Sequence, residues 1–237
     1  MTGEILSARH MTRRYGGFIA VDDVLLEVTQ GEIRGLIGPN GAGKTTLMDM
    51  ICGRGGGHSK GEVTLRGRRI DGLDVRMRRK AGLGRSFQKT NIFPDLTILE
   101  QMMLAARATG TDDAAEVMEA LQIAALAGWR AGDVSYGDQR RVDLALTLTG
   151  RPPVVLLDEP AAGLSIGESL ALSALLKDLA RRWGVTVLIV EHDMDIIFSI
   201  CDRITVMQLG KILTTGTSDE IRTNPDVVRA YLGSAAT

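Results

Sequence analysis

A glycine-rich stretch at residues 38–45, "GPNGAGKT", limits the fold of this chain more than any other feature. It matches the pattern G-x-x-x-x-G-K-[ST] in full. It also follows an apolar run at residues 33–37 and precedes "KTTLMDMIC", which has the spacing of a helix. Gly38, Gly41 and Gly43 allow the backbone to curl until successive N–H groups point inward. A glycine turn that binds nothing is the alternative, but the strand–loop–helix order favours a nucleoside triphosphate.

The chemistry of this loop assigns roles to its polar side chains. The Lys44 ammonium can reach the β- and γ-phosphates, and the Thr45 hydroxyl can ligate Mg²⁺. The helix that begins here adds its positive N-terminal end. The residues predicted to surround the phosphates are Gly38, Pro39, Asn40, Gly41, Ala42, Gly43, Lys44, Thr45 and Thr46.

Strands and helices alternate along most of the chain, which predicts an α/β fold with a mostly parallel core sheet. "VVLLD" and "VTVLIV" are short apolar runs of the kind that buried parallel strands need. The first 37 residues read instead as short strands separated by turns, and residues 53–62 as a flexible connector. Stretches rich in helix-forming residues, at 96–108, 112–127 and 138–150, predict a helical insert.

Charge and composition exclude some classes of function. The formal net charge is −1, which argues against a protein that coats nucleic acid. Basic clusters at residues 66–69 and 76–80 are expected on the solvated surface, or facing a partner. Cys52 and Cys201 are expected to be free thiols in a reducing cytosol. No apolar run approaches the roughly 20 residues that span a bilayer, so at a membrane another chain would supply the spanning part.

Two acids follow the apolar run "VVLL". Asp158 ends a buried strand, so its carboxylate is expected beside the phosphate loop, where it can hold Mg²⁺. Glu159 points elsewhere and suits a base that polarises an attacking water. The alternative is a pair of acids that favour the start of the next helix, and the phosphate loop upstream argues against it.

A histidine and a glutamine complete the predicted site. His192 follows the second buried strand and is expected at the same sheet edge, where it can contact the γ-phosphate or hold the attacking water. Gln88 follows "GLGRSF", which reads as another strand. Its amide can reach Mg²⁺ or water, or simply lie in a loop, and these alternatives stay open.

A serine marks the start of a helix in "VSYGDQRRVDLAL". Ser135 is predicted to cap this helix, because a serine oxygen accepts hydrogen bonds from the first free N–H groups. The same helix end favours an anion. The stretch therefore reads as a helix cap or as half of a binding site for a negatively charged group.

These motifs, in this order, resemble those of the ATP-binding cassette ATPases of ABC transporters. The resemblance covers nearly the whole chain and rests on "GPNGAGKTT", "FQ", "VSYGDQRR", "VVLLDEP" and "EHD". It implies a single domain over residues 1–237. Residues 1–88 and 151–237 would form a RecA-like P-loop NTPase core with an N-terminal antiparallel β subdomain, and residues 89–150 an inserted α-helical subdomain that carries the family's signature motif.

The resemblance also implies ligands, ATP and Mg²⁺, and roles for individual residues. Tyr15 would stack on adenine. Glu159 would be the catalytic glutamate, His192 the switch histidine, and Gln88 a glutamine that senses the nucleotide. The implied Mg²⁺ ligands are Thr45, Gln88 and Asp158.

The signature motif would serve a second cassette. In a head-to-tail dimer it would close over the γ-phosphate of the partner. Tyr136 and Asp138 depart from the family's usual glycine and glutamine, and Ser165 departs from the Asp that commonly ends the loop at residues 161–165. The signature residues implied to contact that nucleotide are Ser135, Gly137 and Gln139.

A subgroup is suggested by "SYGDQRR", "LLDEPAAGL", "EHDM" and "NPDVVRAYLG". These look like the ATPases of branched-chain amino-acid importers, the class also used for urea and related amides. A weaker resemblance runs to the ATPases of lipopolysaccharide export. The implied partners are a second cassette, as a homo- or heterodimer, transmembrane permease subunits and a solute-binding protein, but no nucleic acid. The implied location is the cytoplasmic face of the plasma membrane.

Non-transport cassette ATPases are the remaining alternative. Those that act on DNA need a long coiled-coil insertion, and those of translation carry two cassettes in one chain, whereas this sequence has one compact set of motifs. Residues 92–94, beside Gln88, are expected to line a groove for a cytoplasmic helix of the membrane partner. In the following helix, Leu96, Leu99 and Met103 have the spacing of a packed face.

Overall fold

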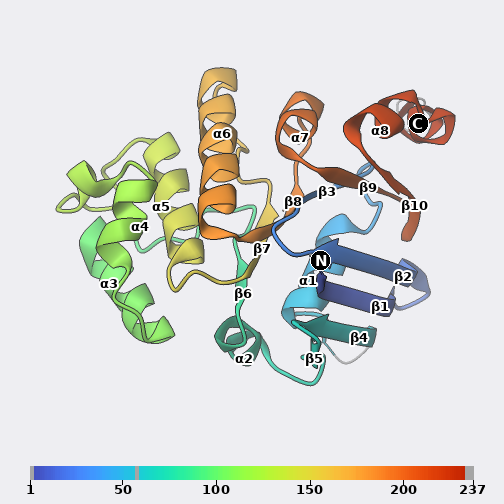
Figure 1. Ribbon diagram of the computed structural model, residues 1–237, viewed down its shortest axis with the longest axis horizontal. Coiled ribbons are helices and arrows are strands. Elements are labelled where there is room, and N and C mark those ends of the chain that lie inside the picture. Colours follow the sequence, from blue (N-terminus) through green and yellow to red (C-terminus); the bar gives the residue numbers. More distant parts are fainter. Residues whose placement is uncertain (1–2, 57–58, 233–237) are drawn as a thin grey trace.

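The computed structural model describes residues 3–56 and 59–232, and its centre is a six-stranded sheet (Figure 1). The strand order is β10-β9-β3-β8-β7-β6, and every neighbouring pair is parallel except β10–β9. All residues of β7 and β8 are buried, which explains their apolar sequences. The sheet confirms the predicted α/β fold. Its strands are β3 (Ile33–Ile37), β6 (Leu83–Arg85), β7 (Val154–Asp158), β8 (Thr186–Val190), β9 (Arg203–Gln208) and β10 (Lys211–Gly216).

A second, antiparallel sheet of four strands contains the N-terminal strands, in the order β2-β1-β4-β5 (Figure 1). The predicted connector at residues 53–62 is wrong in its second half, because β4 begins at Ser59 and pairs with β1. Helix α1 packs its apolar side chains against both sheets and so lies between them. The elements here are β1 (Glu4–Tyr15), β2 (Phe18–Thr29), α1 (Lys44–Cys52), β4 (Ser59–Leu65) and β5 (Arg68–Arg69).

Helices cover the other face of the parallel sheet, where a second hydrophobic cluster joins β7 and β8 to α6 and α7. The predicted helix at 112–127 is wrong beyond Ala120. Gln122 takes a left-handed backbone with φ of 60°, and a short 3-10 turn follows. The helices are α2 (Val75–Lys80), α3 (Ile98–Thr109), α4 (Ala114–Ala120), η1 (Ala124–Leu126), α5 (Tyr136–Leu148), α6 (Ile166–Trp183), α7 (Met194–Ile200), α8 (Ser218–Thr223) and α9 (Pro225–Leu232).

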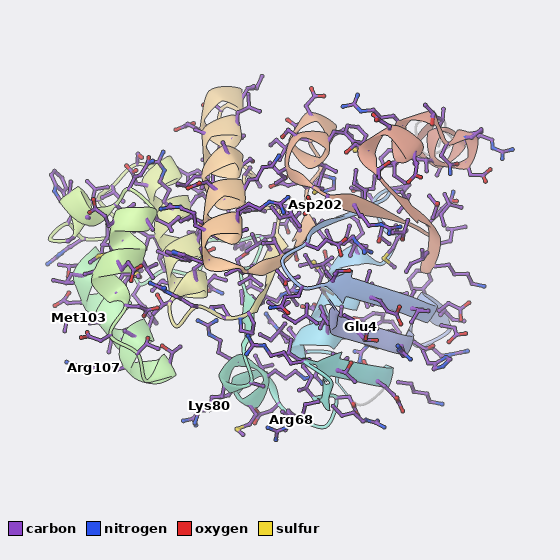
Figure 2. All side chains as sticks on the ribbon, in the orientation of Figure 1. Glu4, Arg68, Lys80, Met103, Arg107 and Asp202 are labelled. Atoms are coloured by element: carbon purple, nitrogen blue, oxygen red, sulfur yellow. The ribbon has the colours of Figure 1, made fainter. Side chains whose placement is uncertain are left out.

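The packed face of α3 differs from the prediction. Ile98 and Met102 are fully buried, whereas Leu99 and Met103 are 41% and 43% exposed. Met103 lies at the outer edge of the molecule (Figure 2). Both sets of residues have helical spacing, and the packing of α3 against α4 and α5 buries the 98/102 side.

One of the predicted basic clusters is partly buried. Arg78 is only 5% exposed, and its guanidinium donates to four backbone carbonyls, those of Met50, Ile51, Asp71 and Leu73, at 2.6–2.9 Å. Its neighbour in the cluster, at position 79, likewise donates to a carbonyl of the chain. The expectation of a wholly solvated cluster at residues 76–80 is therefore wrong, because this cation satisfies the free carbonyls at the end of α1.

The remaining parts of the basic clusters lie on the surface as expected. Arg68 and Lys80 are exposed and are visible at the rim in Figure 2. Both cysteines are free thiols, which confirms that prediction. Among the described residues, no helix combines the length and the apolar character that a membrane span requires.

Candidate functional site

The phosphate loop connects β3 to α1 at the carboxyl edge of the parallel sheet. Its glycines are needed for their backbone conformation and because neighbouring backbone leaves no room for a side chain. Gly43 has φ of 102°, and a Cβ there would lie 2.4 Å from the Ala20 carbonyl oxygen. A Cβ on Gly38 would lie 2.1 Å from the Met207 oxygen. Any other residue at these two positions would collide with a backbone oxygen, so only glycine allows the loop to pack this close to Ala20 and Met207.

Lys44 is folded onto the loop that precedes it. The residue is 7% exposed, and its ammonium donates to the Gly38 oxygen at 2.6 Å and the Pro39 oxygen at 3.1 Å. Burial lowers the pKa of this amine, and the charges of Glu159 and Asp158 act in the opposite direction. The cation is thus placed between the loop and the two acids that the sequence predicted beside it.

A cavity of about 290 Å³ lies over the loop. Tyr15 and Phe18, at the turn between β1 and β2, line one part of it, and Glu159 and His192 line another. The loop residues in its lining are Asn40, Gly41, Ala42, Gly43, Lys44, Thr45 and Thr46. The structure therefore brings the predicted aromatic, the phosphate loop and the predicted catalytic pair to one cavity.

Asp158 is the last residue of β7 and is 2% exposed. Burial raises the pKa of its carboxyl group, an effect that the nearby Arg85 guanidinium reduces. Arg85 Nη2 lies 3.1 Å from Asp158 Oδ2 and 3.0 Å from Asp49 Oδ1 in α1. Arg85 was not predicted, although a lone arginine within the strand-like "GLGRSF" was a signal for a buried charge partner.

Glu159 turns away from Asp158, as predicted. Its backbone is left-handed, with φ of 51°, and its N–H donates to Val190 in β8. Gln88 Nε2 donates to Glu159 Oε2 at 2.9 Å, and His192 Nε2 lies 2.7 Å from Glu159 Oε1. The three predicted catalytic residues thus form one hydrogen-bonded group, although they come from the ends of different strands.

A third acid at this edge, Glu191, was missed. Glu191 is 6% exposed, and its Oε1 accepts a hydrogen bond from the Ala161 N–H at 2.8 Å. Burial raises the pKa of its carboxyl group, while N–H groups of Ala161 and His192 lower it. Glu191 therefore ties the loop after Glu159 to the segment of the histidine, and the charge at the end of "VTVLIVE" was the available signal.

The predicted helix cap at Ser135 is present. Its Oγ accepts from the Asp138 N–H at 3.1 Å and donates to Asp138 Oδ2 at 2.7 Å. Gln139 Nε2 donates to the Val134 oxygen at 3.1 Å. Gly137, the third signature residue, faces Glu168 at the start of α6. Among the described residues that line the phosphate-loop cavity, none belongs to the signature.

Ser165, which departs from the family's usual Asp, caps the next helix. It accepts from the Glu168 N–H, while Glu168 accepts from the Ser165 N–H and hydroxyl. This reciprocal capping box begins α6 directly after the loop at residues 160–165. Serine thus caps the helix in place of the family's usual Asp.

The profile of the ABC transporter family matches residues 21–162, from β2 through the phosphate loop and the signature to Asp158 and Glu159. The chain belongs to the ABC transporter family. A second profile, described as the branched-chain amino acid ATP-binding cassette transporter, matches residues 211–237. The cassette is therefore an ATPase of a transporter, as the motifs predicted.

Curated relatives align with the cassette over nearly its whole length. The high-affinity branched-chain amino acid transport ATP-binding protein LivG of Salmonella typhimurium is 37% identical, over 99% of this chain and 100% of its own. The lipopolysaccharide export system ATP-binding protein LptB of Acidithiobacillus ferridurans is 34% identical, over 97% of each. The chain is thus an ABC ATP-binding subunit homologous to the importer ATPases, and its identity to the export ATPase is lower.

Solved structures have the same fold. An ATP-binding cassette of an ABC transporter in its ADP conformation matches with a TM-score of 0.87 at 27% identity, over 98% of this chain and 100% of that chain. A dimeric cassette in a post-hydrolysis state, bound to ADP and Pi, matches with a TM-score of 0.79 at 26% identity, over 90% and 99%. These matches confirm the P-loop NTPase fold and ATP as the ligand.

Proposed function

We propose that this cassette is the ATP-hydrolysing subunit of an importer of branched-chain amino acids or related small amides. The observation that carries the substrate class is the agreement between full-length identity to LivG and the C-terminal match at residues 211–237. The lining of the cavity over the phosphate loop supports the assignment of residues 40–46 to the phosphates and of Tyr15 to adenine, and Gly38 and Pro39 hold Lys44 through their carbonyl oxygens.

Mg²⁺ is the metal that the donor atoms fit. Thr45 and Asp158 offer a hydroxyl and a buried carboxylate, and Gln88 keeps its amide oxygen as an acceptor when its nitrogen bonds Glu159. Within the described residues, no three His, Cys, Asp or Glu groups gather into a metal cluster. This agrees with Mg²⁺, which is usually held by one or two protein oxygens together with substrate phosphates and water. When bound, the ion would neutralise charge on the β- and γ-phosphates.

Glu159 acts as the base that orients and polarises the attacking water. Its carboxylate is 13% exposed and reaches the cavity between Gln88 and His192. Hydrogen bonds to both carboxylate oxygens fix its orientation, so the carboxylate is already positioned to accept a proton from the attacking water. His192 is about half exposed at the cavity, and its hydrogen bond to Glu159 holds the imidazole beside the place where the transferred phosphoryl group would lie.

The signature of a second cassette completes the site. Ser135 lies at the N-terminus of the 13-residue helix α5, where free N–H groups and the helix dipole favour an anion. Ser135, Gly137 and Gln139 would therefore cover the γ-phosphate on the partner. The dimeric ADP-bound relative supports this pairing.

The helical segment, residues 89–150, is the part that we propose to contact the membrane partner. Phe93 is 60% exposed five residues after Gln88, and Leu99 and Met103 are exposed apolar side chains of α3. In this division residues 1–88 and 151–237 form the nucleotide-binding core. The cassette would sit on the cytoplasmic face of the plasma membrane, with permease subunits above it and a solute-binding protein on the opposite side.

Purification of tagged cassette from detergent-solubilised membranes tests the proposal. We expect two integral permease subunits and a solute-binding protein to co-purify, and transport of a branched-chain amino acid to depend on Glu159. Recovery with lipopolysaccharide-export components would favour the export alternative. Recovery with nucleic acid or ribosomes alone would overturn a transport function.

A further inference from the structure

Two side chains of the signature helix α5 form hydrogen bonds with the loop that follows Glu159. Tyr136 Oη donates to the Ala162 oxygen at 3.3 Å, and Arg140 Nη2 donates to the same oxygen at 3.0 Å. Ala162 belongs to the loop at residues 160–165, between Glu159 and α6. A single carbonyl of the core thus accepts hydrogen bonds from two residues of the helical segment.

The tyrosine ring adds a steric fit to these hydrogen bonds. Gly163 has φ of 82°, and a Cβ there would lie 2.9 Å from Tyr136 Cε1. The ring also lies 5.2 Å from the Arg140 guanidinium, a cation–π distance. Since Tyr136 is 44% exposed, its contact with the loop is specific in geometry and contributes little as core packing.

Arg140 is held by few other groups. Its residue is 4% exposed, and among the described residues its Nε and Nη1 have no hydrogen-bond partner. A buried guanidinium with unpaired donors is costly unless its remaining contacts fix it. The Asp143 charge lies within range of this guanidinium, and the Ala162 carbonyl and the Tyr136 ring hold it at the loop, so the two side chains support each other there.

The loop that they grip is also tied to the catalytic residues. Ala161 donates its N–H to Glu191, which precedes His192. The 160–165 loop therefore has Glu159 before it, Glu191 on one side and the signature helix on the other. A movement of the loop would pull on the signature of the same chain.

We propose that Tyr136 and Arg140 are positioning residues that lock the signature to the 160–165 loop. This inference rests on the head-to-tail dimer of the proposed function. There the signature of one chain serves the partner's ATP, while Glu159 of that chain serves its own. The lock makes the two move as one body, so that closure at one ATP site positions the catalytic glutamate at the other.

Dimer formation tests the lock in a Glu159→Gln chain, which binds ATP without turnover. Tyr136→Phe removes one hydrogen bond and should raise the ATP concentration for half-maximal dimerisation about threefold. Tyr136→Gly also removes the ring and should raise it at least about tenfold. In chains with Glu159 intact, the Hill coefficient for ATP hydrolysis should fall in the same order. Wild-type values in both variants would overturn the proposal.

A double-mutant cycle isolates the contact in the nucleotide-free chain. Gly163→Ala strains the left-handed backbone in any background, but its collision with the ring exists only when Tyr136 is present. We expect a larger drop in melting temperature in the wild-type background than in Tyr136→Gly. Additive drops would contradict the contact.

Amide hydrogen exchange separates a failure of the lock from a failure of the dimer. Tyr136→Gly should accelerate exchange in residues 160–165 of the monomer, whether or not a dimer forms. Unchanged exchange would overturn the lock. If exchange accelerates but the Glu159→Gln chain does not dimerise with ATP, the dimer of the proposed function fails, and with it the coupling role of Tyr136.

Discussion

At the carboxyl edge of the core sheet, Gln88, Glu159 and His192 contact one another through their side chains. At the start of α5, by contrast, Ser135 forms hydrogen bonds with Asp138 of the same helix, and Gln139 donates to Val134, just before the helix. The predicted catalytic residues thus meet within one chain, whereas the signature side chains are bonded at the end of the helix that carries them. This difference agrees with the proposal that the core carries the chemistry and that the helical segment supplies shape and position.

Replacing the base gives the largest effect at the core edge. Glu159→Gln should lower the rate of ATP hydrolysis by at least about a hundredfold, because the amide cannot accept the proton of the attacking water. Nucleotide affinity should persist, because residues 38–46 are untouched. A phosphate-release assay and fluorescent-nucleotide titration check both values. Asp195→Asn, at an exposed acid nearby, is the control, and near wild-type hydrolysis by Glu159→Gln would contradict the assignment.

Blocking the signature should affect assembly and leave monomer binding intact. Ser135→Arg places a long side chain over the helix end and should prevent ATP-dependent dimerisation, as measured by analytical ultracentrifugation. Ser135→Thr keeps the capping hydroxyl and serves as the control. Dimerisation of Ser135→Arg at the wild-type ATP concentration would contradict the contact in trans.

The two faces of α3 should respond differently to the same change. Met102→Ala removes a fully buried side chain and should lower the free energy of unfolding by about 3 kcal/mol. Met103→Ala, on the exposed face, should change it by less than about 0.5 kcal/mol. It should instead weaken recovery of the permease. Urea unfolding of the pair measures the stability, and equal losses would refute the assignment of faces.

The buried guanidinium of Arg78 should contribute more to the free energy of unfolding than that of Arg76, which is exposed. Arg78→Met leaves backbone carbonyls around the end of α1 without a donor and should cost about 2 kcal/mol. Arg76→Met removes the same charge from an exposed position and is the matched control. Equal unfolding free energies for the two variants would contradict the buried role.

A buried acid of the helical segment should make stability depend on pH. Burial raises the pKa of Asp143 from 3.8 to about 6, although its carboxylate accepts a hydrogen bond from the Asn91 N–H. Because the folded-state pKa is the higher one, the ionised group costs stability above pH 6, and the cost disappears as pH falls toward 3.8. Asp143→Asn should therefore raise the free energy of unfolding more at pH 8 than at pH 4, by up to about 3 kcal/mol. A difference that is constant with pH would argue against this ionisation.

The catalytic edge was predictable because its signals are local. The segments 33–37, 44–52 and 154–158 were predicted with the bounds that the structure has, since each is an apolar or helical run ended by glycine, proline or a charge. The meeting of Glu159 and His192 followed from a general rule, because neighbouring parallel strands end at the same edge.

Features that depend on distant neighbours were not predictable. Leu99 and Ile98 are equally apolar, and only the packing of α3 on α4 and α5 decides which is buried. The sequence around Arg78 is typical of a surface cation, and only the fold shows that the end of α1 lies beside it. Tyr136 is a departure from the family pattern, and Gly163, which leaves room for its ring, lies in another part of the chain.

The helical segment is, in its connectivity, an enlarged crossover between two neighbouring strands. β6 ends at the nucleotide edge and β7, its parallel neighbour, begins at the opposite edge, with all of α3, α4, η1 and α5 between them. About a dozen residues suffice to join parallel strands. Most of residues 86–153 can therefore lengthen, shorten or be exchanged between relatives without unpairing the sheet. The segment is joined to the core sheet at two places, after β6 and before β7. A permease that tilts the segment would therefore move the chain beside Gln88 and the chain that enters β7 together.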